Sequence, residues 1–339
     1  MNPKLKNIIR FSVFLGIGIF FIWIFLHNLT AEQKQEIIHS MGNANYWWIA
    51  MAIPLGILSH YLRALRWKML IETMGYKPGN RNMFFAVMIG YFANLALPRL
   101  GEVSRCTILT KYENVPFQKS FGTVITERVL DMLVFVLLFF LNLALQAERL
   151  SGYINENIYK PLQSKLHLSY NLSGAFTILM ISFIVVFGIL FLVFRKKITA
   201  NKFFIKIKNT ALGFVEGIKS LVNVGNKWLF FFYTFAIWTL YLLMAYVVFF
   251  SIPDSSGLGL DAGLAILVFG TIGIMVVQGG IGIYPAIVAE TLVLYGVASM
   301  QGYALGWLIW TSQNVTIVLV GIISLILLPI LNNRKNEKA

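Results

Sequence analysis

Two arginines lie in the second long apolar segment of the chain, where charged side chains are costly and therefore informative. Arg63 and Arg66 are three residues apart, so they share one face of a helix. Two guanidinium groups on one face can bind a phosphate in the bidentate manner that arginine favours. They would serve equally well as anchors at the cytoplasmic end of a spanning helix, with Trp67 at the interface.

A second charged group follows Asn94 and Pro98, where another apolar segment is interrupted. Arg99, Glu102 and Arg105 recur every third residue and would form a charged stripe at the start of a short helix. A helix N-terminus also directs unpaired N–H groups and a partial positive charge towards an anion. The group favours phosphate binding, and the alternative is an ion network satisfied within the protein.

A third group lies one to two turns inside the next apolar segment. Glu127 and Asp131 are four residues apart, and Arg128 is three residues before Asp131. Buried charges need partners, which Arg99 or Arg105 could supply. The group therefore predicts either contact with a lipid headgroup or a structural cross-link between neighbouring segments.

Glycines mark a second interruption, at residues 278–285. Gly280 and Gly282 would let a ligand approach the backbone closely, although small residues also serve ordinary helix packing in membranes. Glu290 follows in an otherwise apolar segment and would need a partner. The scattered histidines and the single Cys106 show no ligand spacing, so we expect no metal and no cofactor.

The elements that must position these residues are membrane helices. Hydrophobic residues make up 58% of the 339 positions and charged residues 12%, against about 25% charged in soluble domains. A span needs about 20 apolar residues. The segments that qualify are 8–27, 46–71, 119–146, 172–194, 228–251 and 303–331. The first resembles a signal peptide, but no cleavage site follows it, so we expect an uncleaved span.

Two further apolar stretches, 82–112 and 262–298, are broken by proline and glycine. Broken helices are tolerated at membrane depth where protein or a water-filled cavity surrounds the break, so we predict two re-entrant hairpins. The expected fold is an all-α integral membrane protein with six transmembrane helices plus two re-entrant helical hairpins. Residues 1–339 would form a single membrane domain.

Residues 46–146 and 228–331 would each contain a span, a hairpin and a second span. Because the two hairpins would enter from opposite faces, the units are predicted to form an inverted repeat. Paired broken segments of this kind indicate the substrate site of a transporter. The alternative is two kinked helix pairs without a transport role.

The loop charges predict the orientation. With these spans, 23 of the 28 basic residues lie on the side of both termini and 4 on the other, so the N- and C-termini are predicted to be cytoplasmic. The net charge of +14 then indicates anionic lipid partners rather than nucleic acid. Residues 195–227 are predicted to be a cytoplasmic amphipathic linker, or alternatively an ordinary packed helix.

Together, these motifs resemble the flippase-like transmembrane region of lysylphosphatidylglycerol synthases, the multiple peptide resistance factor family. The resemblance covers about residues 5–330 and is carried, in chain order, by Arg63-x-x-Arg66-Trp67, Asn94-x-x-x-Pro98-x-x-Gly101-Glu102-x-x-Arg105, Ser120-Phe121, Glu127-Arg128-x-x-Asp131 and Gly279-Gly280-x-Gly282. It implies lipid translocation in the bacterial inner membrane. It does not imply aminoacyl transfer, because no synthase domain precedes Ala339.

We therefore expect a flippase that moves a phospholipid or lipid-linked intermediate between leaflets, and not an enzyme. The alternatives are a membrane-embedded enzyme acting on lipid or isoprenoid phosphates, or a non-catalytic envelope scaffold. The protein could form a homo-oligomer in each of these functions. The residues expected to bind the lipid headgroup are Arg63, Arg66, Asn94, Arg99, Glu102, Arg105, Glu127, Arg128, Asp131, Gly280 and Gly282.

Overall fold

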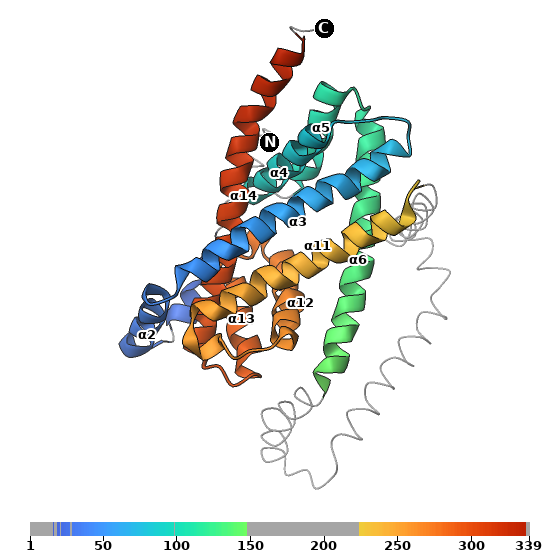
Figure 1. The fold of residues 1–339 in the computed structure, drawn as a ribbon. Coiled ribbons are helices and arrows are strands. Elements are labelled where there is room, and N and C mark those ends of the chain that lie inside the picture. Colours follow the sequence, from blue (N-terminus) through green and yellow to red (C-terminus); the bar gives the residue numbers. More distant parts are fainter. Residues whose placement is uncertain are drawn as a thin grey trace, which may run out of the picture. The chain divides into compact units, whose positions relative to one another are not determined.

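The computed structural model describes residues 29–97, 99–147 and 224–336, together with residues 16, 19, 20 and 22–27. In these residues every regular element is a helix, which confirms the all-α class (Figure 1). The elements are α2 (Ala31–Gly42), α3 (Tyr46–Glu72), α4 (Asn80–Ala96), α5 (Leu100–Glu113), α6 (Phe117–Leu145), α11 (Lys227–Val248), η2 (Phe249–Ser251), η3 (Pro253–Ser255), α12 (Leu260–Val276), η4 (Gln278–Gly280), α13 (Ile283–Val293) and α14 (Ser299–Asn336).

Four helical segments are long and apolar enough to cross a membrane: Tyr46–Glu72, Phe117–Leu145, Lys227–Ser251 and Ser299–Asn332. They coincide with four of the six predicted spans. The predicted span 172–194, most of 8–27 and most of the linker 195–227 lie outside the described residues.

Residues 28–45, which connect the first two predicted spans, contain the helix α2. The reason is a capping box that the apolar pattern did not reveal. The Thr30 side chain accepts a hydrogen bond from the Gln33 backbone N–H, and the Gln33 side chain accepts one from the Thr30 backbone N–H.

The stretch predicted as the first hairpin consists of α4 and α5, which pack against each other. Helix α4 ends because Leu97 is extended, with φ −144° and ψ 133°. Arg99, directly before α5, adopts a left-handed conformation with φ 66°. Asn94 then accepts a 2.7 Å hydrogen bond from the backbone N–H of Gly101, at the start of α5. A side chain at Gly101 would collide with the carbonyl oxygen of Gly90, so glycine permits the close packing of the two helices.

The stretch predicted as the second hairpin consists of α12, η4 and α13, and its break is built by glycines. Gly279, Gly280 and Gly282 have positive φ angles between 69° and 75°, which a residue with a side chain rarely adopts. The indole N–H of Trp310 on α14 donates a 2.6 Å hydrogen bond to the Gly279 carbonyl. This contact ties the break to the last helix.

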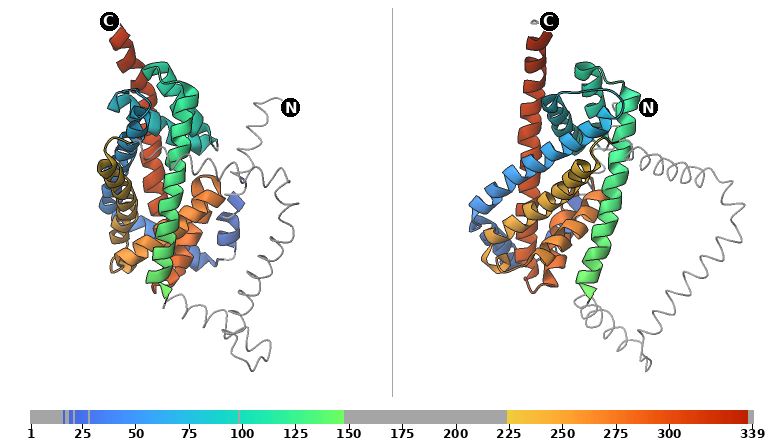
Figure 2. Two further views of the ribbon diagram at one scale, coloured as in Figure 1. Left: turned by 90° about the vertical axis from the view of Figure 1, so that its right-hand side faces the viewer. Right: turned by 45° about the vertical axis from the view of Figure 1, so that its right-hand side comes forward.

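Each helix pair has its own buried core. Trp67, Met83 and Leu109 belong to one cluster, which joins α4 and α5 to α3. Val288 and Tyr303 belong to another, which joins α13 to α14 and to residues of α11 and α12. Helix α11 runs alongside α3, and α14 packs against both α4 and α13 (Figures 1 and 2).

Candidate functional site

The breaks of both helix pairs line one cavity, whose volume is about 1140 Å³. Leu97 and Arg99 contribute from the first break, and Val276 and Gly279 from the second. Side chains from α3, α6, α11, α13 and α14 complete the wall. The volume exceeds the range of about 300–1,000 Å³ that is usual for small-molecule sites, so the cavity suits a large ligand.

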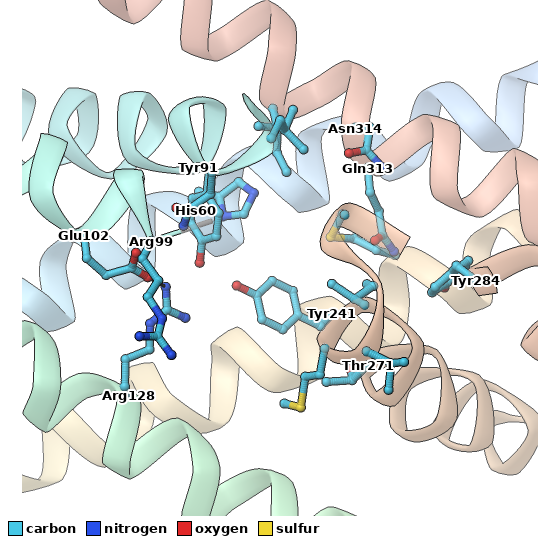
Figure 3. A pocket seen from close by; sticks show the side chains of 18 of the residues that line it. His60, Tyr91, Arg99, Glu102, Arg128, Tyr241, Thr271, Tyr284, Gln313 and Asn314 are labelled. Carbon is cyan, nitrogen blue, oxygen red and sulfur yellow. Dashed lines mark hydrogen bonds and ion pairs between the residues drawn. The ribbon is translucent and has the colours of Figure 1, made fainter. Parts of the chain in front are cut away.

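One side of the cavity is charged, and it holds Arg99, Glu102 and Arg128 (Figure 3). Arg128 donates a 2.7 Å hydrogen bond to a carboxylate oxygen of Glu102. The ion pair therefore joins α5 to α6 at the charged side of the cavity.

Arg99 differs from Arg128 in its pairing. Among the residues that the structure describes, no carboxylate lies within salt-bridge distance of Arg99, and its side chain is exposed. Its left-handed backbone costs roughly 1–2 kcal/mol in a residue other than glycine. Strain of this kind is concentrated at functional sites, and here it places a guanidinium group at the cavity.

Aromatic side chains form the wall beside the charged groups. The rings of His60 and Tyr91 lie 4.5 Å apart between centroids, and Tyr241 points towards the charged side (Figure 3). The Tyr241 hydroxyl accepts a 3.3 Å hydrogen bond from the Nε–H of Arg63. In the described part of the chain, the Nδ1 atom of the buried His60 has no hydrogen-bond partner.

The opposite side of the cavity carries neutral polar groups: Thr271, Tyr284, Gln313 and Asn314 (Figure 3). Tyr284 and Gln313 share a side-chain hydrogen bond. The Asn314 amide donates a 2.8 Å hydrogen bond to the Trp310 carbonyl. The amide oxygen of Asn314 is not used in that contact and can accept a hydrogen bond from a ligand.

The rim of the cavity is apolar and exposed. Leu100 and Val103 at the start of α5 are 38% and 43% exposed, and Met275 and Val276 at the end of α12 are 59% and 63% exposed. An opening bordered by such side chains would face the acyl chains of a bilayer.

A buried ion network lies behind the charged side of the cavity. Nη1 of Arg63 lies 3.2 Å from Glu127 and 2.6 Å from Asp131, and Nη2 of Arg66 lies 3.1 Å and 2.7 Å from the same carboxylates. Nη1 of Arg105 lies 2.8 Å from Glu127. Three guanidinium groups thus surround two carboxylates and join α3, α5 and α6.

Neighbouring side chains hold this network in place. The Arg105 guanidinium lies over the ring of Trp67, 4.7 Å from its centroid. The Trp67 indole donates a 2.9 Å hydrogen bond to Thr123, and Arg66 donates a 3.3 Å bond to Thr234 on α11. The side chains of Arg66 and Glu127 are fully buried, so the centre of the network is shielded from solvent.

A comparison with known proteins identifies the family of this chain. The family model of the lysylphosphatidylglycerol synthase TM region matches residues 8–333. The chain belongs to this family. It is accordingly a multi-pass membrane protein, and the expected resemblance is confirmed.

Individual relatives match over shorter regions. A UPF0104 membrane protein of Methanocaldococcus jannaschii is 35% identical over 105 residues, which are 30% of this chain and 31% of that protein. A UPF0104 membrane protein of Methanothermobacter thermautotrophicus is 29% identical over 106 residues, again 30% and 31%. The glycosyltransferase AglD of Haloferax volcanii is 25% identical over 134 residues, 39% of this chain and 21% of that protein.

The alignments thus span less than a third of each relative's length. No solved structure matches the chain. These relatives are archaeal, so the predicted location in a bacterial inner membrane stays a prediction.

In this family member, the predicted headgroup residues fall into three sets. Asn94, Arg99, Glu102 and Arg128 line the cavity. The members of the buried network do not line it; they are Arg63, Arg66, Arg105, Glu127 and Asp131. Gly280 and Gly282 shape the second break, where Gly279 lines the cavity.

Of the predicted partners for the α6 carboxylates, Arg105 contacts Glu127, whereas Arg99 contacts neither in the described structure. Glu290 is exposed on α13 and has no ion pair among the described residues.

The sequence pattern did not single out five polar residues of the cavity, which are His60, Tyr91, Tyr241, Gln313 and Asn314. Their signal was a polar side chain within an apolar helix, which is weaker than a charge.

Proposed function

We propose that this protein translocates a phosphate-bearing lipid between the leaflets of a membrane. The observation that carries the proposal is a single cavity that both helix breaks line, with arginines at one side and an exposed apolar rim. Arginine matches the phosphate of a lipid, and an apolar rim matches its acyl chains. The same site can therefore bind both the phosphate and the acyl chains of a lipid.

In this proposal the α4–α5 and α12–α13 pairs are re-entrant hairpins in the membrane. At 1.5 Å per residue, the 17-residue α4 is about 25 Å long and the 11-residue α13 about 16 Å, short of the ~30 Å hydrocarbon core. The two pairs enter from opposite faces and belong to inverted units, and both termini are cytoplasmic. The predicted loop charges support this orientation.

The lipid phosphate is bound by Arg99 and Arg128, while the acyl chains stay in the bilayer beyond Leu100 and Met275. Binding to Arg128 would weaken its ion pair with Glu102, which links α5 to α6. The buried network positions α3, α5 and α6 around the site and does not itself contact the lipid. Rocking of one unit against the other would then change which leaflet the cavity opens to.

A second candidate function is suggested by one relative, the glycosyltransferase AglD. A membrane-embedded enzyme acting on a lipid phosphate could use the same arginines. The carboxylate of Glu102 at this site is paired with Arg128, so it is poorly placed to act as a free base. We therefore favour translocation.

Reconstitution into vesicles tests the proposal. Fluorescent phospholipids are placed in both leaflets, and a membrane-impermeant quencher then reports how fast the inner pool becomes accessible. The protein should raise this rate, and Arg99→Gly should reduce it at least tenfold. Arg81→Gln is the matched control, because Arg81 is an exposed arginine on α4 that does not line the cavity.

Mass spectrometry of the extracted lipids separates the alternatives. Unchanged lipids together with accelerated redistribution support translocation. A new lipid species would show an enzyme instead. Neither redistribution nor a new species across a panel of phosphate-bearing lipids would contradict both functions and leave the scaffold interpretation.

A further inference from the structure

The charged groups of the cavity leave one positive charge without a counter-ion. The lining of the cavity contains the guanidinium groups of Arg99 and Arg128 and the carboxylate of Glu102. Glu102 is already paired with Arg128. Within the described lining, no further carboxylate is present that could receive a cationic amine, while Arg99 is available to an anion.

The aromatic wall does not compensate for the missing carboxylate. Tyrosine faces can bind ammonium groups, but the Arg63 guanidinium already lies 5.9 Å from the ring centroids of both Tyr91 and Tyr241. A second cation beside these rings would be repelled by Arg63. The site therefore disfavours a headgroup that carries an ammonium ion.

The neutral side of the cavity offers hydrogen bonds without charge. Gln313 and Asn314 present amides that can donate and accept, and Thr271 and Tyr284 present hydroxyls. On the aromatic wall, the buried Nδ1 atom of His60 has no partner in the described structure. Amides and hydroxyls on the neutral side, together with the imidazole on the aromatic wall, match a ligand that carries hydroxyl groups.

From this juxtaposition we infer that the cavity selects an anionic phospholipid whose phosphate bears an uncharged, hydroxyl-bearing headgroup. The phosphate binds Arg99 and Arg128, and the hydroxyls bind the amides of Gln313 and Asn314 on the opposite side (Figure 3). Lipids whose headgroup ends in an amine are bound more weakly. The inference rests on the proposed function, because it assumes that a lipid occupies this cavity.

Competition binding tests the selectivity without transport. Fluorescent phosphatidylglycerol is bound to the purified full-length protein in detergent, and unlabelled lipids displace it. Phosphatidylglycerol should compete at a concentration at least tenfold lower than phosphatidylethanolamine or lysylphosphatidylglycerol. It should also outcompete phosphatidic acid, which has the phosphate but no headgroup hydroxyls, and soluble glycerol 3-phosphate, which lacks acyl chains.

A charge swap tests the assignment to these residues. Gln313→Glu has nearly the same shape and supplies the missing carboxylate, so the preference for phosphatidylglycerol over the two amine lipids should fall at least tenfold. Asn314→Asp supplies a carboxylate independently if the first variant does not fold. Arg81→Gln should leave the preference unchanged, because Arg81 does not line the cavity.

The outcomes separate this inference from the proposed function. Equal competition by the amine lipids or by phosphatidic acid overturns the inference, even if vesicle assays show translocation. An unchanged preference in both carboxylate variants overturns the assignment to Gln313 and Asn314. Selective binding without any translocation would support the inference and contradict the flippase.

Discussion

Arg128 on α6 and Glu102 on α5 form an ion pair of 2.7 Å at the wall of the cavity, on the same side as Arg99. The pair neutralises one of the two cavity arginines and leaves the other available. The other described arginines of this region differ from Arg128. Three are paired in a buried network, and Arg99 faces a cavity without a carboxylate partner in the described residues.

The strained backbone of Arg99 allows its two roles to be separated. Arg99→Gly removes the left-handed strain of roughly 1–2 kcal/mol, and the greater freedom of glycine in the unfolded chain offsets about 1 kcal/mol of that gain. The free energy of unfolding should thus stay within about 1 kcal/mol of the original, while lipid translocation falls at least tenfold. Denaturant unfolding and the vesicle assay measure the two effects. Unchanged translocation would remove Arg99 from the site.

The buried network should dominate stability. Asp131→Asn removes one of two carboxylates that face three arginines, and leaving a buried charge uncompensated costs about 3 kcal/mol or more. Unfolding in detergent should show this loss. Glu72→Gln is the control, because Glu72 forms an exposed pair with Lys68 at 3.6 Å and should change stability by less than about 0.5 kcal/mol. Equal effects of the two variants would contradict the structural role of the network.

Glycine at the α4–α5 contact is required for packing. Gly101→Ala would place a methyl group against the Gly90 carbonyl and the Asn94 side chain, so the helices must separate at a cost of about 2 kcal/mol. Gly122→Ala on α6 meets nothing within 4 Å and should raise stability by about 0.5–1 kcal/mol. Thermal unfolding of both variants checks the opposite signs, and a stabilising Gly101→Ala would refute the close packing.

The second break depends on a hydrogen bond from α14. Trp310→Phe removes the donor to the Gly279 carbonyl. The free energy of unfolding should fall by about 1 kcal/mol more than the smaller size of the phenylalanine ring would cause by itself. Trp238→Phe provides the comparison, because in the described structure its indole N–H has no partner. The difference between the two free energies of unfolding isolates the hydrogen bond, and a difference near zero would show that the bond does not stabilise the break.

Much of the secondary structure could be predicted from the sequence because its causes are local. Twenty-residue apolar runs require helices in lipid, and closely spaced proline and glycine residues can end a helix, although the single Pro54 lies within α3. Both predicted breaks, at 94–102 and 278–285, are therefore breaks in the structure. The capping box of α2 was equally local, but apolar periodicity does not detect it.

The sequence by itself also determined the membrane class and the helix face that Arg63 and Arg66 share. Only the tertiary structure decided that these arginines are buried against Glu127 and Asp131, while Arg99 lines a cavity. Spacing within a helix specifies a face but not the neighbour that the face will meet. The cavity wall brings together segments from His60 to Ile317, so its composition depends on long-range packing that no local pattern encodes.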